Sequence, residues 1–199
     1  MRIVVKDRSD NQKYRAESGQ AIAEFAIVFP VLLLLVLGVI QFSLMYMAKG
    51  VVEYAAYAAA RAELVDEDPE RAAEFVCSAI SGPSYDRGSG QTITVPGWGV
   101  LPRSESSSIK TSVAVIDGVG NGSGEITVEV THIYELVIPV VSMLFKPISE
   151  PVEPDDVPAG IFVTINDAPH IVLRSTYTRP VPWDDELRGV TGHPVIPDL

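Results

Sequence analysis

The sequence has few of the residues that build disulfides, metal centres or nucleic-acid sites. It has one cysteine, Cys77, in 199 residues, so it cannot form an internal disulfide or a cysteine-ligated zinc or iron–sulfur centre. Its 15 Lys and Arg are outnumbered by 26 Asp and Glu, and the pI of about 4.6 excludes an electrostatic footprint for nucleic acid. We expect Cys77 to be a small core residue, with an intermolecular disulfide outside the cytoplasm as the alternative.

Sequence signals of catalysis and metal binding are absent as well. His132, His170 and His193 are far apart, and none lies in a metal-binding spacing such as HExxH. The chain has no GxSxG nucleophile motif, phosphate-binding loop or Cys–His nucleophile pattern. We therefore predict that the protein is not an enzyme and uses no cofactor or metal; a membrane-tethered enzyme built from distant residues is the alternative. His132 is in phase with the apolar positions of its predicted strand, so we expect a core histidine.

Apolar residues are concentrated in one block near the N-terminus. Residues 25–48 contain no Asp, Glu, Lys, Arg or His, and these 24 residues exceed the ~20 that a helix needs to cross the hydrocarbon core of a bilayer. Residues 1–19 carry five basic and three acidic side chains, whereas basic residues are sparse just after the block. This bias predicts a cytoplasmic N-terminus and an extracytoplasmic remainder.

Three kinds of N-terminal segment compete to explain this block: a cleaved secretory signal, a permanent signal anchor and a prepilin-type leader. A secretory signal has an apolar region of about 7 to 15 residues and a small-residue cleavage site. The apolar block is longer and leads into residues 41–47, QFSLMYM, which offer no such site. A cleaved secretory signal therefore fits least well.

Glu24 bears on the choice between the other two. A charged side chain at the middle of a membrane helix costs roughly 2.5 to 3.5 kcal/mol, and less near an end, so a compensating group is expected. Cleavage between Gly19 and Gln20 would create an α-ammonium at Gln20, one helical turn from Glu24 on the same face. That amine, or one from a neighbouring subunit, would neutralise the carboxylate. The alternative is that Glu24 reaches to the membrane interface.

Residues 18–30, SGQAIAEFAIVFP, resemble the start of the TadE-like pseudopilins of Tad (Flp, type IVc) pilus systems, and the resemblance extends to about residue 63. It depends on a glycine, a four-residue spacer, the pair Glu24 and Phe25, and Pro30 ahead of the span. A leucine-rich run and an alanine-rich segment at residues 55–61 follow. Gln41 departs from the family, which often has an acidic residue near this position.

The resemblance implies that a prepilin peptidase of the inner membrane cuts after Gly19, so that Gln20 becomes the first residue and Glu24 the fifth. It implies a minor pseudopilin of a Tad pilus or related secretion apparatus, which takes part in filament initiation, priming or anchoring. The implied partners are the inner membrane, the prepilin peptidase, other pilins or pseudopilins, and pilus assembly proteins. The implied location is the bacterial inner membrane as a single-pass protein, at the base of a pilus or within it.

An unprocessed, signal-anchored envelope protein that acts as a binding or structural module is the alternative function. In either case the pattern predicts an α+β fold, with a long N-terminal transmembrane helix that continues into an amphipathic helix and a small extracytoplasmic domain with an antiparallel sheet. Pro30 is expected to kink the helix. The expected parts are a leader at 1–19, a transmembrane helix at 20–48, a helical region at 49–81, an antiparallel β domain at 82–179 and a proline-punctuated tail at 180–199.

Local signals mark the elements of the outer domain. Asp68 followed by Pro69 predicts the start of a second helix. Two alternating runs around a glycine-rich connection predict an antiparallel hairpin, and residues 161–165 and 171–177 predict further strands. The expected apolar face of the second helix comprises Ala72, Phe75, Val76, Ala79 and Ile80.

Two further segments have no periodic pattern of their own. Residues 84–108 are rich in Gly, Ser and Pro and are predicted to be a loop with a short strand at 91–95. Trp98 is expected to plug the edge of the domain, with a binding residue as the alternative. Residues 136–145 are apolar but would reach only about 15 Å as a helix. We therefore expect them in the core or in an interfacial patch, and not in a second span.

Overall fold

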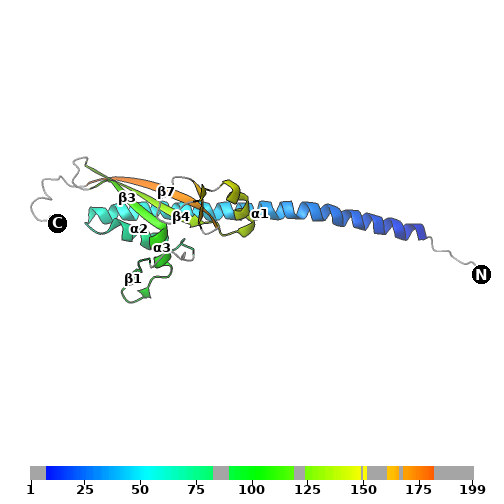
Figure 1. Cartoon of the computed structure of the whole chain (residues 1–199), viewed down its shortest axis with the longest axis horizontal. Helices are drawn as coiled ribbons and strands as arrows, with labels where there is room; N and C mark the ends of the chain where they lie inside the picture. The colour runs from blue at the N-terminus through cyan, green and yellow to red at the C-terminus, as the bar shows by residue number, and fades with distance from the viewer. Residues whose placement is uncertain are drawn as a thin grey trace, which may run out of the picture.

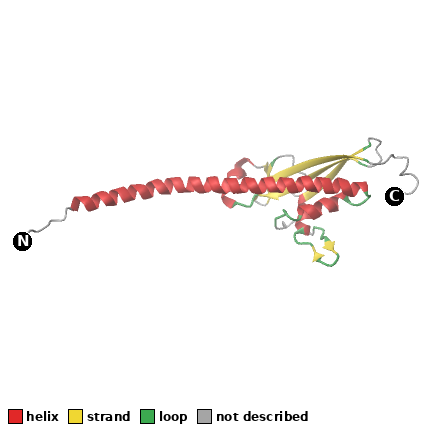
Figure 2. Ribbon diagram, turned by 180° about the vertical axis from the view of Figure 1, so that it is seen from behind, coloured by secondary structure: helices red, strands yellow, loops and turns green. Residues whose placement is uncertain are grey.

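The computed structural model describes residues 8–82, 90–118, 124–148, 150–151, 161–165 and 168–181. One long helix, α1 (Arg8–Leu64), runs the length of the molecule. A small mixed domain covers only its C-terminal half, and its N-terminal half stands clear of that domain (Figures 1 and 2). This arrangement confirms the predicted α+β fold with a long N-terminal helix.

Helix α1 has 57 residues, which corresponds to about 85 Å at 1.5 Å per residue. It continues without a break through Pro30 and past the apolar block to Leu64. The alanine-rich stretch favours this continuation because alanine has the highest helix propensity. The expected unbroken run from the apolar block into the domain is confirmed.

Helix α2 (Pro69–Cys77) begins as predicted. The Asp68 carboxylate accepts hydrogen bonds from the backbone N–H groups of Glu70 (3.0 Å) and Arg71 (3.3 Å), and Pro69 occupies the first turn, where its missing N–H is not needed.

The predicted apolar face of α2 is correct for Val76 and Ile80, which pack against the core cluster, and wrong for Phe75 and Ala79, which are exposed. The buried residues are Ala73, Glu74 and Cys77, whereas Phe75 is 48% exposed. Ala73 and Cys77 belong to the same core cluster as the alanines of α1. Their small side chains let the two helices approach closely, which a face centred on Phe75 would not allow.

Five strands form the main sheet, in the spatial order β3 (Thr111–Asp117), β4 (Glu125–Glu135), β7 (Ala168–Pro180), β6 (Phe162–Ile165) and β5 (Glu150–Pro151). Neighbouring strands are antiparallel except for the short parallel pair β5–β6. The pairing of β3 with β4 confirms the predicted hairpin, although most of its glycine-rich connection lies outside the described residues. The predicted proline-punctuated tail also lies outside them after residue 181.

The segment predicted to be a loop contains three short elements. A hairpin of β1 (Thr94–Val95) and β2 (Gly99–Val100) is followed by helix α3 (Ser104–Lys110). Gly97 and Gly99 have φ angles of 82° and 87°, a region that favours glycine. Trp98 lies between them and is 90% exposed, so the predicted plug over the domain edge is wrong: the turn directs this side chain into solvent.

The core lies between the second half of α1 and the sheet. Ala55, Ala56, Ala59 and Ala60 are fully buried and form one cluster with apolar side chains of β4 and β7. Small side chains on a helix allow the sheet to approach the helix backbone closely, and interiors at this density have no spare volume. The cluster partners from the sheet include Ile126, Val128, Val130, Ile171 and Leu173.

A polar cluster lies at the other side of this core, where α2, α3, β3 and β4 meet. The Ser107 hydroxyl donates to the backbone oxygen of Glu74 at 2.7 Å, and the Thr111 hydroxyl lies 2.9 Å from Nδ1 of His132. His132 is fully buried, so the expected core histidine is confirmed. Burial, with a smaller effect of the Lys110 charge, lowers the pKa of His132 to about 3, and the ring is therefore neutral.

Burial also sets the protonation of the other groups in this polar cluster. Cys77 is fully buried, as expected, and desolvation raises the pKa of its thiol to about 12. Glu74 is 7% exposed; desolvation, followed by the charges of Glu70 and Asp68, raises the pKa of its carboxyl to about 7. Lys110 has its pKa lowered by burial and lies 3.8 Å from the Glu135 carboxylate.

Enlarging a buried alanine of α1 should destabilise the domain. We expect Ala59→Leu to lower the free energy of unfolding by about 1–3 kcal/mol, because the extra methylenes have no room in a packed core. Ala58→Leu on the partly exposed side of the same turn is the matched control and should cost less. Urea unfolding of the full chain in detergent, followed by circular dichroism, measures both; equal losses would contradict the packing described above.

Neutralising Glu74 should stabilise the protein in a pH-dependent way. The folded-state pKa of about 7 exceeds the ordinary value of 4.5, so the favourable contribution of the protonated carboxyl is complete below pH 4.5 and is lost as the pH rises through 7. Glu74→Gln should therefore add little stability at pH 4 and more at pH 8. Urea unfolding of both chains at the two pH values tests this; a gain independent of pH would exclude it.

Candidate functional site

The N-terminal half of α1 has large apolar side chains that the domain leaves exposed. Phe25, Ile27 and Val31 are 64%, 73% and 66% exposed. Within residues 20–64, α1 is long and apolar enough to cross a membrane, and only 6% of its most apolar window is buried. A core helix of a soluble domain would be mostly buried, so this half of α1 requires another apolar environment, such as a bilayer or other helices.

The four residues predicted to mark processing and assembly lie together on this half of α1. Gly19 lies within the helix, and the side-chain amide of Gln20 donates to Oε1 of Glu24 at 2.9 Å. The two side chains therefore share one face, one turn apart, as the sequence predicted. Phe25 stacks on Phe29 with ring centroids 5.3 Å apart, and both rings remain largely exposed.

The position of Glu24 gives it a distinct electrostatic role. It is the last charged residue before the uncharged stretch 25–48. In a chain that began at Gln20, Glu24 would lie in the first turns of the helix, where a carboxylate is stabilised by the positive end of the helix dipole by about 0.3–1 kcal/mol. In the described structure the terminal amide of the Gln20 side chain reaches this carboxylate.

Gln41 is a structural residue whose role the sequence did not reveal. It is 1% exposed, and its side-chain oxygen accepts a hydrogen bond from the backbone N–H of Ile138 at 3.0 Å. Its Nε2 has no hydrogen-bond partner among the residues that the structure describes. This bond ties the outer domain to α1 at the point where the exposed apolar stretch ends. The sequence signal for this role was a single amide side chain within an apolar block. It could not identify the partner, which lies 97 residues away.

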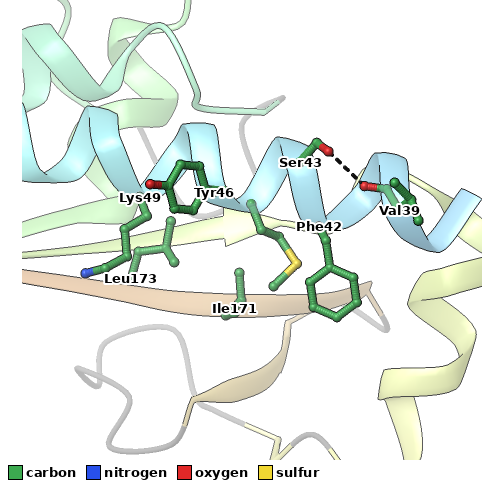
Figure 3. Close-up of a pocket in the computed structure, with 8 residues that line it drawn as sticks. Val39, Phe42, Ser43, Tyr46, Lys49, Ile171 and Leu173 are labelled. Atoms are coloured by element: carbon green, nitrogen blue, oxygen red, sulfur yellow. Dashed lines mark hydrogen bonds between the residues drawn. The ribbon is translucent and has the colours of Figure 1, made fainter.

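An apolar groove of about 670 Å³ lies where α1 passes β7 (Figure 3). Ile171 and Leu173 of β7 form one wall, and α1 forms the other. Lys49 marks the end of the groove farther from the apolar block; its ammonium lies 3.5 Å from the Glu53 carboxylate and donates to the backbone oxygen of Arg174 at 3.3 Å. The residues of the α1 wall are Val39, Phe42, Ser43, Met45, Tyr46 and Lys49.

The polar cluster in the domain core is not arranged as a reaction site. Cys77 and His132 are both fully buried, so no substrate reaches them, and the raised pKa of the Cys77 thiol keeps it protonated. Among the described residues, no three His, Cys, Asp or Glu side chains come together in a way that could hold a metal ion.

Comparison with known proteins identifies the same helix. No curated protein and no solved structure matches the chain. Residues 19–61 match the family model described as TadE-like protein, and this match begins at the predicted cleavage position and ends in the buried alanine stretch of α1. The resemblance to the TadE-like family is thereby confirmed, and α1 is the part of the protein that shows it.

Proposed function

We propose that the protein is a minor pseudopilin of a Tad-type pilus or related secretion apparatus, processed after Gly19. The observation that supports this function best is the exposed apolar half of α1, which coincides with the TadE-like match at residues 19–61. The match itself suggests a Tad pilus-associated protein; filament initiation, priming or anchoring is our finer proposal. The role is one of assembly and not of catalysis.

In this proposal the chain is a single-pass protein of the bacterial inner membrane. Residues 1–19 form a cytoplasmic leader, residues 20–48 the transmembrane helix, and residues 49–81 a helical region outside. Residues 82–179 form the β domain, and residues 180–199 the tail. The orientation is supported by the excess of basic over acidic side chains before the span.

Assembly would occur laterally, through contacts between transmembrane helices. After removal of the leader, the α-ammonium of Gln20 or of a neighbouring subunit pairs with Glu24 and fixes the stagger between helices. The attraction between the two charges is strong in hydrocarbon because a medium of low dielectric constant screens it little. Pro30 removes one backbone hydrogen bond of the helix, so the span can bend at this point. The partners are the prepilin peptidase, other pilins or pseudopilins, and pilus assembly proteins.

The mass of the N-terminal peptide tests processing. We expect protein from its own membranes to begin at Gln20 when the host's prepilin peptidase is present and at Met1 when it is absent. Gly19→Leu is a matched variant because it enlarges the residue at the cleavage position without changing the charge. In membranes that contain the peptidase, this variant should remain uncut. An intact Met1 terminus in both strains would favour the unprocessed signal anchor instead.

Loss of the Glu24 charge should impair assembly and leave membrane insertion intact. Removing an ion pair worth about 1.4 kcal/mol lowers the association constant of two helices about tenfold. Glu24→Ala should therefore strongly reduce pilus formation or secretion. Glu24→Gln keeps a hydrogen bond to Gln20 but no charge, and it should fail as well. Glu53→Ala, an exposed carboxylate on the same helix outside the span, is the control. Normal assembly of the Glu24 variants would remove this residue from the mechanism.

A further inference from the structure

Helix α4 (Pro139–Phe145) lies beside α1 at the end of the domain from which the exposed half of α1 emerges (Figure 1). The hydrogen bond between Gln41 and the backbone of Ile138 fixes the start of α4 to α1. A single 3-10 turn, η1 (Lys146–Ile148), follows. This end of the domain therefore lies next to the exposed apolar stretch of the long helix.

Helix α4 is apolar on its inner and its outer side. Val141 is buried, and Phe145 stacks on Phe162 of β6 with ring centroids 4.9 Å apart. Met143 and Leu144 nevertheless are 70% and 55% exposed. A helix that is hydrophobic all round is normally covered on every side, so the outer side of α4 lacks a cover within the described chain.

The exposed apolar residues of α4 and of the segments next to it are together called the α4 patch. Each member is at least half exposed although it is aliphatic or a methionine. Exposed apolar patches of soluble domains mark interaction sites with proteins or membranes. The α4 patch comprises Val137, Val140, Met143, Leu144, Ile148 and Ile161.

The height of the α4 patch along α1 identifies its partner. Twenty helical residues cross about 30 Å of hydrocarbon. Within the proposed transmembrane helix at residues 20–48, the part in hydrocarbon therefore ends near Gln41, the residue tied to α4, and residues 42–48 lie at the lipid–water interface. On the following turns, Phe42 and Tyr46 are 64% and 84% exposed, and Lys49 comes next. Aromatic and then basic residues beyond an apolar span are typical of the lipid–water interface.

We propose that the α4 patch is a second membrane contact and lies in the lipid interface of the leaflet on the C-terminal side of the span. The proposal rests on the membrane-spanning role of α1. Helix α4 has seven residues and is too short to span, but its outer side can enter the boundary between headgroups and acyl chains. The contact is continuous with the exposed apolar surface of α1, and its named residues are uncharged, so it needs no anionic lipid.

The α4 patch gives the outer domain a fixed orientation on the membrane. With α1 as the single membrane contact, the domain would be free to tilt relative to the membrane. A second contact at the α4 patch restricts this tilt. In this orientation the apolar groove, whose wall includes Phe42 and Tyr46, lies at the interface, and the β1–β2 hairpin points away from α1 (Figure 1). Entry into a filament would require the α4 patch to leave the lipid or to exchange it for a neighbouring subunit.

Nitroxide labels on the full chain in vesicles of phosphatidylcholine test this contact. Met143→Cys reports on the α4 patch, Val36→Cys on the middle of the span, and Val100→Cys on the β1–β2 hairpin; all three positions are exposed. The unsubstituted chain, whose only cysteine is buried, is the blank. Accessibility to oxygen and to a water-soluble nickel complex gives the depth of each label.

We expect the Met143 label at a depth of about 5–10 Å below the headgroups, the Val36 label in hydrocarbon and the Val100 label in water. A Met143 label as accessible to nickel as Val100, with Val36 still in hydrocarbon, would overturn the α4 contact and leave the span intact. A Met143 label shielded from both reagents, with spin coupling that vanishes on dilution by unlabelled chain, would assign the patch to a second copy and also overturn it. A water-accessible Val36 label would exclude the span itself.

Discussion

The structure depends on one constraint: a single continuous helix must remove apolar side chains from water along its whole length, and the domain covers only half of it. In the covered half, alanines let the sheet approach closely, and Ala55 and Ala59 are fully buried. In the other half the side chains are large, and full burial of each is worth about 1.5–3 kcal/mol. The protein itself provides no such burial for Ile27 or Val31, so this half must be covered by lipid or by other chains.

Elements with local or periodic signals could be predicted from the sequence, and elements fixed by distant contacts could not. Asp68 and Pro69 define the start of α2 through bonds within one turn. Helix α3, in contrast, is held by serine hydroxyls, including the bond from Ser107 to the backbone of Glu74, 33 residues away. Apolar periodicity contains no information about such bonds. The exposure of Trp98 likewise follows from the turn geometry and not from its hydrophobicity.

The same distinction applies to the candidate site. Gln20 and Glu24 could be placed together because helical spacing alone brings positions i and i+4 onto one face, and the structure shows them in contact. The α4 segment was expected in the core or in an interfacial patch, and the structure places Val141 in the core and leaves Met143 exposed. Its attachment to Gln41 could not be predicted, because nothing local links positions 41 and 138.

Gln41 and Glu24 flank the exposed apolar stretch of α1, and the difference between their partners indicates where intermolecular contacts are needed. The oxygen of Gln41 is bonded to the backbone of the chain's own domain. Glu24 is bonded within the described structure to Gln20 only, a neutral amide one turn away, which leaves its charge uncompensated. A buried charge requires an opposite charge in a low-dielectric environment. The side-chain oxygen of Gln41 is therefore satisfied within one chain, whereas Glu24 has only a neutral hydrogen-bond partner in the described structure.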